Sequence, residues 1–274
     1  MIQDIIVNLS VAKQKEVAGD AAIDLAARFD AHLSAVAFAY TPPTAATGMY
    51  GFPALLAEWK ADRQAEAERA KQAFEGRARA AGIQFDCRVL SDNVENAALI
   101  FSSIARNYDL SVVAQAEPDD GLTETLMIES ALFDSGRPVL VIPYIQTNGV
   151  RLDRIMVCWD GSRNAARAVG DALPLLKQAK HIDVVTVEQK ERRTELRGAA
   201  IAEHLARSDL KVDLKSIVAP DSDVANVVLS HAADSGTDLI VMGAYGHTRL
   251  REFVLGGATR DILSSMTVPV LMSH

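Results

Sequence analysis

Several features that would place this chain in a membrane or outside the cell are missing from its sequence. No apolar run approaches the roughly 20 residues that a membrane-spanning helix needs. The opening residues, MIQDIIVNLS, lack a basic segment followed by a long apolar stretch, so we do not expect a signal peptide. Cys87 and Cys158 lie far apart and form no CxxC pair, which favours two reduced thiols in or near the core. A cytoplasmic location is therefore expected.

Common catalytic motifs are missing as well. The sequence has no Walker lysine, no GxSxG nucleophile elbow, no HExxH zinc motif and no GxGxxG after its first expected strand. The histidines show no metal-ligand spacing, so no metal site built from side chains is expected; those considered are His32, His181, His204, His231 and His274. No catalytic residue is predicted, and an enzymatic role is disfavoured.

The charge balance excludes another group of functions. The formal net charge is -8 and 49% of the residues are hydrophobic, as in a soluble globular protein. This acidity argues against non-specific binding to nucleic acid or to an anionic membrane surface. A local anion site stays compatible with it, because backbone amides alone can build one.

The chain repeats one plan of alternating strands and helices in its two halves. Each half contains five short apolar runs separated by helical stretches, which is typical of a parallel sheet covered by helices. The repeat at the same spacing indicates an internal duplication. We predict two tandem, doubly wound, five-stranded α/β domains, residues 1–146 and 151–274, joined by the polar stretch Gln146–Arg151.

The closing strands bear on how the halves associate. Pro138 and Pro269 stand at the start of these strands, and proline suits a strand at the edge of a sheet. An exposed apolar edge is usually covered or paired. Pairing of the two halves through their last strands is therefore the expected arrangement.

A glycine-rich stretch follows the fourth strand of the second half. Gly243 ends that strand, Gly246 follows after two residues, and Gly256 and Gly257 follow after nine more. Glycine lets a ligand approach the main chain closely. A helix that begins near Gly257 presents unpaired amides and the positive end of its dipole. Such a loop is suited to hold phosphate groups.

An acidic residue is expected beside this loop. Asp160 follows the first strand of the second half, in WDGS. In a doubly wound sheet the ligand crevice lies where the strand order reverses, at the carboxyl ends of the strands. If the first and fourth strands are neighbours, Asp160 lies next to Gly243 and could accept hydrogen bonds from a ribose hydroxyl or a base. Capping of the following helix is a second, compatible role.

These residues resemble the universal stress protein family. Gly243, Gly246 and Gly256 match the glycines of its ATP-binding members, in which the last glycine is followed by serine or threonine. By this resemblance Asp160 contacts the nucleoside, and the backbone of Val187 meets adenine. The resemblance also implies an adenine nucleotide alpha hydrolase-like or flavodoxin-like strand order in both halves.

One departure from the family pattern affects the phosphate end of the site. Gly257 occupies the place of the serine or threonine, so either Thr259 replaces that hydroxyl or the phosphates rest on amides alone. Within the loop, His247 is favoured over Arg249 and Arg251 as a phosphate contact. The candidate nucleotide-binding residues are Asp160, Val187, Gly243, Gly246, His247, Gly256, Gly257, Ala258 and Thr259.

The first half departs from the pattern completely. Its fourth strand runs into QAEPDDGLTETLMIES, which has acidic residues where the three glycines would stand. Ser10 takes the place that Asp160 has in the second half. Because carboxylates repel phosphate, we expect no nucleotide site there.

The resulting hypothesis is a stress-response protein that binds ATP or another adenine nucleotide, with or without Mg²⁺, as a signal rather than a substrate. A slow metal-dependent ATP hydrolase and a ligand-free scaffold, associating through edge strands or residues 41–81, are the alternatives. The stress, the protein partner and the oligomeric state, with a homodimer among the options, stay open.

Overall fold

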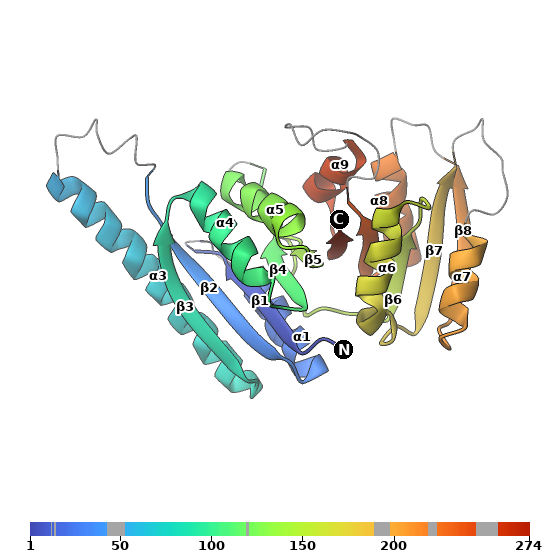
Figure 1. The fold of residues 1–274 in the computed structure, drawn as a ribbon, viewed down its shortest axis with the longest axis horizontal. Helices are drawn as coiled ribbons and strands as arrows, with labels where there is room; N and C mark the ends of the chain where they lie inside the picture. The colour runs from blue at the N-terminus through green and yellow to red at the C-terminus, as the bar shows by residue number, and fades with distance from the viewer. Residues whose placement is uncertain are drawn as a thin grey trace. The chain divides into compact units, whose positions relative to one another are not determined.

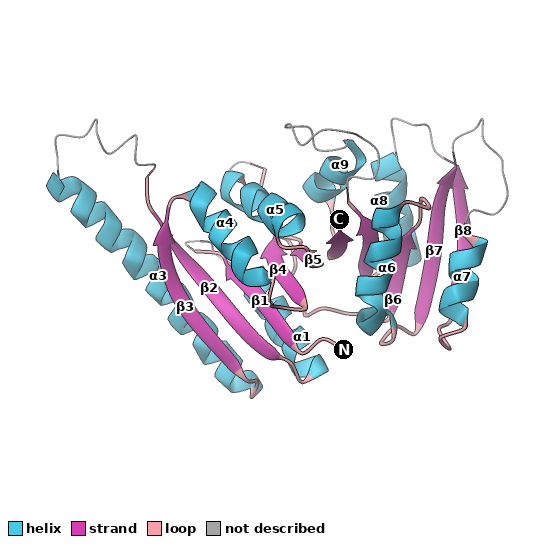
Figure 2. Ribbon diagram, viewed as in Figure 1, coloured by secondary structure: helices cyan, strands magenta, loops and turns pink. Residues whose placement is uncertain are grey.

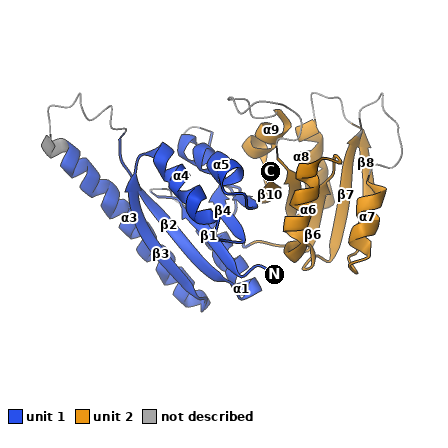
Figure 3. Ribbon diagram, in the orientation of Figure 1, with its two compact units in different colours: residues 1–149 blue, residues 150–274 orange. Residues whose placement is uncertain are grey.

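The chain divides into two compact units. The computed structural model describes residues 1–11, 13, 15–42, 53–118, 121–188, 198–218, 224–244 and 257–274. The first unit is Met1–Gly149 and the second is Val150–His274 (Figure 3). The division falls within the polar stretch between Gln146 and Arg151.

Unit 1 is a parallel sheet with helices on both faces. Along the chain its elements are β1 (Asp4–Leu9), α1 (Val17–Phe29), β2 (His32–Tyr40), α3 (Pro53–Ala81), β3 (Phe85–Asp92), α4 (Val94–Ala105), β4 (Leu110–Ala114), α5 (Leu122–Asp134) and β5 (Val139–Ile142). The strand order is β3-β2-β1-β4-β5, and every neighbouring pair is parallel. Helices α4 and α5 pack together on one face, and α1 and α3 pack together on the other (Figures 1 and 2).

Unit 2 has the same plan. Its elements are β6 (Arg154–Cys158), α6 (Arg163–Leu176), β7 (His181–Glu188), α7 (Ala199–Ala206), β8 (Val212–Val218), α8 (Val224–Ser235), β9 (Leu239–Gly243), α9 (Gly257–Ser265) and β10 (Val270–Ser273). The strand order is β8-β7-β6-β9-β10, again with parallel pairs throughout. The prediction of a doubly wound α/β fold is thus confirmed for both units.

Strand order decides where a ligand could sit. In each unit the first strand lies between the second and the fourth, so the order reads 3-2-1-4-5. Flavodoxin, in contrast, has the order 2-1-3-4-5. The connections therefore leave the first strand in opposite directions, and the reversal falls between the first and fourth strands, β6 and β9 in unit 2.

The cores lie against the central strands. The middle of β1, all of β4 and the middle of β6 are buried, as are four of the five residues of β9. Strands β3 and β8 lie at the outer edge of each unit's sheet, and their side chains alternate between partly buried and exposed. Continuous apolar runs therefore mark the central strands, as expected when both faces of a sheet are covered.

In both units, an aspartate that directly precedes the fourth strand forms hydrogen bonds with the backbone at the start of the first strand. Asp109 accepts hydrogen bonds from the amides of Gln3 (2.7 Å) and Asp4 (3.2 Å). Asp238 accepts from the amide of Arg154 at 2.9 Å in the same way. In both, the aspartate's own amide donates to the carbonyl of the strand residue that it binds. The same arrangement of hydrogen bonds thus links the first and fourth strands in both units.

Two expectations from the sequence concern association of the halves and membrane-spanning helices. Association of the halves through their last strands stays a prediction. Among the helices of the described residues, none combines the length and apolar character that crossing a membrane would take.

Candidate functional site

The carboxyl ends of β6 and β9 meet where the strand order of unit 2 reverses. Val157 pairs with Val241 and Cys158 with Met242, so the two strands run in register to their ends. Asp160 follows β6 by two residues, and Gly243 is the last residue of β9. The expected neighbourhood of the first and fourth strands is therefore present.

Gly243 lies against the first turn of α6. A Cβ built on this glycine would stand 2.5 Å from the carbonyl carbon of Asn164 and would overlap the amide nitrogen of Ala165. Because both contacts are backbone atoms, no side-chain movement could relieve them. Glycine is thus required here by the packing of strand against helix, whether or not a ligand is bound.

A polar cluster holds the chain just after Gly243. The buried amide of Asn164 donates to the carbonyl oxygen of Ala244 at 2.6 Å and lies 3.1 Å from Nδ1 of His274. That ring nitrogen is 3.2 Å from the same carbonyl oxygen. The backbone amide of Ala244 donates to the carbonyl of Ser273 at 2.9 Å. These contacts fix the residue from which the glycine loop departs.

Asn164 and His274 were missed by reasoning from the sequence. Asn164 stands inside a helix, where asparagine carries no positional signal, and His274 lies 110 residues further along the chain. The only hint was the run DGSRN, which marks a helix start without showing what the asparagine contacts.

Asp160 is exposed and shapes the turn that leads into α6. Its Oδ1 accepts a hydrogen bond from the amide of Ser162 at 2.8 Å, and Gly161 between them has φ of +78°. Ser162, rather than Asp160, is the N-cap, because its hydroxyl accepts from the amide of Ala165 at 3.1 Å. Ser162 thus caps the helix, and the Asp160 carboxylate orders the turn that precedes it.

The carboxylate of Asp160 acts on the thiol of Cys158, the half-buried last residue of β6. Burial, and secondarily the Asp160 carboxylate, raises the pKa of the Cys158 thiol to about 12. Burial likewise raises the pKa of Cys87 to about 12. Both cysteines are free and half-buried, and a raised pKa disfavours the nucleophilic thiolate in each.

Val187 and helix α9 complete the described part of the site. Val187 is half-buried on β7, beyond Val185, whose carbonyl accepts from the amide of Trp159 at 2.8 Å. At the start of α9, Gly257 and Ala258 are exposed, whereas Thr259 is only 5% exposed. Apart from its chain neighbours and the backbone of α9, no atom of the described residues lies within 4 Å of the position that a Cβ on Gly257 would take. A hydroxyl on residue 257 would therefore point into free volume, while Thr259 packs inward.

Three predicted site residues, Gly246, His247 and Gly256, lie outside the described residues. Their contacts stay predictions, as does the role of each residue in binding a nucleotide. Of the described members, strand register brings Asp160, Val187 and Gly243 to this edge of the sheet, while Gly257, Ala258 and Thr259 form the start of α9.

The corresponding edge of unit 1 is built differently. Glu16 occupies the N-cap of α1, where its carboxylate accepts from the amides of Gly19 (3.0 Å) and Ser10 (3.1 Å). Burial raises the pKa of this carboxyl to about 7. Nearby, the ammonium of Lys13 lies 3.3 Å from Glu117 and 3.9 Å from Glu124. Carboxylates therefore surround the end of β1 here, in contrast to the glycines of unit 2.

Comparison with known proteins finds a family match for unit 2. Residues 151–274, all but the first residue of unit 2, match the universal stress protein family model. Universal stress protein Slr1230 of Synechocystis is 25% identical over 140 residues, 49% of this chain and 46% of that protein. Universal stress protein MJ0577 of Methanocaldococcus jannaschii is 31% identical over 70 residues, 23% of this chain and 43% of that protein. The chain thus matches less than half the length of these curated relatives.

The fold extends this likeness to both units. A universal stress protein of known structure from Archaeoglobus fulgidus aligns with 98% of this chain and 97% of its own, with a TM-score of 0.72 and 16% identity. At this identity the likeness concerns the fold alone. Residues 151–274 thus match the universal stress protein family model, and the whole chain shares the fold of a universal stress protein of known structure.

Proposed function

We propose that unit 2 binds an adenine nucleotide, ATP in the first place, at the carboxyl ends of β6 and β9. The observation that carries this proposal is the register of β6 with β9, which brings Asp160 and Gly243 to the same edge of the sheet at the point where the strand order reverses. Ligands of open α/β sheets bind at such points.

The phosphate groups would rest at the start of α9. This helix has nine residues, and its first two, Gly257 and Ala258, are exposed. Free amides and the helix dipole at such an end favour an anion. The space around Gly257 leaves room for a phosphate to approach the backbone. The spacing of Gly243, Gly246 and Gly256 supports the same assignment by its resemblance to ATP-binding family members.

The nucleoside would lie across the end of β6. The exposed carboxylate of Asp160 is suited to accept hydrogen bonds from ribose hydroxyls, and its turn is already ordered by the amide of Ser162. The backbone of Val187, at the end of the neighbouring β7, would meet the adenine ring. Because the turn is held before binding, little ordering free energy would be spent on this half of the site.

The nucleotide would act as a signal. The sequence supplies no Walker lysine and no motif that would activate a water molecule. Binding would instead bias the conformation of residues 243–259 and so change a surface that a protein partner reads. A Mg²⁺ ion would enter with the phosphates, since it needs few protein ligands.

Calorimetric titration with ATP, ADP and AMP, each with Mg²⁺, tests the proposal. We expect one nucleotide per chain, and Asp160→Ala should weaken its binding roughly tenfold or more, the loss of a hydrogen bond to a charged group. Ser10→Ala, the matched change in unit 1, should leave the affinity unchanged.

Two outcomes would support the alternatives instead. Absence of binding at millimolar nucleotide would favour a scaffold without ligand. Release of inorganic phosphate that depends on Mg²⁺ and disappears in Asp160→Ala would favour a hydrolase using the same site.

A further inference from the structure

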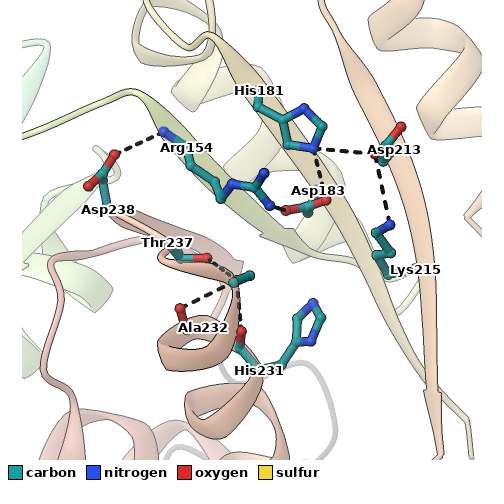
Figure 4. A network of polar contacts seen from close by, with 10 residues as sticks. Arg154, His181, Asp183, Asp213, Lys215, His231, Ala232, Thr237 and Asp238 are labelled. Carbon is teal, nitrogen blue, oxygen red and sulfur yellow. Dashed lines mark hydrogen bonds and ion pairs between the residues drawn. The ribbon is translucent and has the colours of Figure 1, made fainter.

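A cluster of three potential metal ligands lies at the opposite edge of the unit 2 sheet. His181 is the first residue of β7, Asp183 follows on the same strand, and Asp213 lies near the start of β8 (Figure 4). Asp183 and Asp213 are register partners, and His181 precedes Asp183 by two residues. Because side chains alternate along a strand and align between register partners, all three stand on one face. This edge carries the amino ends of the strands, away from the proposed nucleotide site.

The spacing of the three ligand atoms suits a tetrahedral ion. Nε2 of His181 lies 3.2 Å from Oδ1 of Asp183 and 3.4 Å from Oδ2 of Asp213. All three ligand atoms lie within 4.8 Å of one another. With Zn–N and Zn–O bonds of about 2.0–2.2 Å, two tetrahedral ligands stand about 3.4 Å apart. The His181–Asp183 and His181–Asp213 separations therefore match this ligand spacing without any rearrangement of the side chains.

The guanidinium of Arg154 orients the carboxylate of Asp183. Asp183 is buried, at 1% exposure, and Nη1 of Arg154 binds its Oδ2 at 2.9 Å. Arg154 is the register partner of His181 and so stands on the same face. The guanidinium holds one carboxylate oxygen and turns the other toward His181, as outer partners of metal ligands commonly do.

Lys215, His181 and Asp213 are exposed enough to leave the cluster accessible to an ion. Lys215 approaches Asp213 only to 3.8 Å and is 46% exposed, so its ammonium is able to move into solvent. The side chains of His181 and Asp213 are 28% and 54% exposed. An ion could thus reach the cluster and keep a water molecule as its fourth ligand.

Unit 1 offers a comparison within the same chain. His32 and Asp86 occupy the places of His181 and Asp213, but Ser34 stands where unit 2 has Asp183. The Ser34 hydroxyl donates to Asp86 at 2.6 Å, and the two ring nitrogens of His32 face different carboxylates, Asp4 at 3.9 Å and Asp86 at 3.5 Å. The fold therefore forms without a third ligand at this position, and the unit 2 arrangement is not a requirement of the sheet.

We infer that His181, Asp183 and Asp213 form a binding site for a divalent transition metal ion, with Zn²⁺ the best match to one imidazole and two carboxylates. The ion would join β7 to the edge strand β8 and stabilise unit 2 by an amount that grows with the logarithm of the free ion concentration above its dissociation constant. This site is separate from the proposed nucleotide site and needs no nucleotide.

Titration of the chelator-treated full chain with Co²⁺, without nucleotide, tests the inference. Co²⁺ replaces Zn²⁺ in tetrahedral sites and gives visible absorption there. We expect one ion per chain, displaced by Zn²⁺, with the absorption lost in His181→Ala and in Asp213→Asn. His32→Ala, the matched change in unit 1, should bind as the parent does.

Folding of each variant is checked by far-ultraviolet circular dichroism in the presence of chelator. Because Asp213 is more than half exposed, Asp213→Asn keeps the test valid even if His181→Ala is unstable. The inference is overturned if the parent gives no absorption, if His181→Ala and Asp213→Asn retain it, or if His32→Ala abolishes it as well.

Discussion

Gly243 at the end of β9 and Ala165 in the first turn of α6 are packed so closely that no Cβ fits between them. A Cβ on Gly243 would overlap the amide nitrogen of Ala165 and stand 3.0 Å from its Cα. The first glycine of the proposed nucleotide loop therefore has a packing role that is independent of any ligand. Gly257, at the start of α9, has no described atom within 4 Å of an added Cβ beyond its chain neighbours and the backbone of that helix.

This difference predicts opposite effects of the same substitution. Gly243→Ala should lower the free energy of unfolding by about 1–3 kcal/mol, the usual cost of overpacking against atoms that cannot move. Gly257→Ala should be neutral or stabilising by up to about 1 kcal/mol, because alanine favours the helix and meets nothing. Urea unfolding of both variants beside the parent measures this. Equal losses in the two would contradict the packing argument.

Residue 257 also allows a gain of nucleotide affinity to be predicted. Gly257→Ser restores the hydroxyl that ATP-binding family members have after their third glycine. A new hydrogen bond to a phosphate should tighten ATP binding by roughly tenfold. Gly257→Ala is the matched control, since it adds the Cβ without the hydroxyl. If both variants bind ATP as the parent does, residue 257 does not face the phosphates.

Asn164 should matter for stability through the carbonyl that it satisfies. Its amide donates to the carbonyl oxygen of Ala244 at 2.6 Å in a buried setting. Asn164→Ala leaves that oxygen without this donor and should cost about 1–3 kcal/mol. Asn164→Asp should be at least as harmful, because a carboxylate places a second acceptor against the carbonyl. Thermal unfolding of both variants beside the parent measures these losses. An unchanged midpoint in Asn164→Ala would show that His274 or water donates to the Ala244 carbonyl in place of Asn164.

Glu16 should make stability depend on pH. Its pKa in the folded chain is raised by burial from 4.5 to about 7. A raised folded-state pKa means that the stabilising contribution is complete below pH 4.5 and is lost as the pH rises to about 7. The full shift corresponds to about 3 kcal/mol.

The variant Glu16→Gln separates this effect from the other titrating groups. Without an ionisable group at residue 16, the free energy of unfolding should fall less between pH 4.5 and 7 than in the parent. Urea unfolding across that interval measures both proteins. Parallel curves would mean that the carboxyl of Glu16 titrates alike in the folded and unfolded chains.

The succession of strands and helices was readable from the sequence because it depends on local patterns. Continuous apolar runs marked β4 and β9, and the alanine-rich stretches after the first strands marked α1 and α6. The glycine spacing after β9 was likewise visible, since all its members are close in the chain. By itself the sequence determined the fold class and the neighbourhood of the proposed nucleotide site.

Only the tertiary structure decided which distant residues meet. The 3-2-1-4-5 order, the contact of Gly243 with Ala165, and the meeting of Asn164 with His274 depend on strand order and helix packing. The cluster of His181, Asp183 and Asp213 escaped a search for metal-ligand spacing because its third member comes from another strand. Local periodicity fixes which face a residue takes, but register between strands fixes its neighbour, and register is a property of the folded sheet.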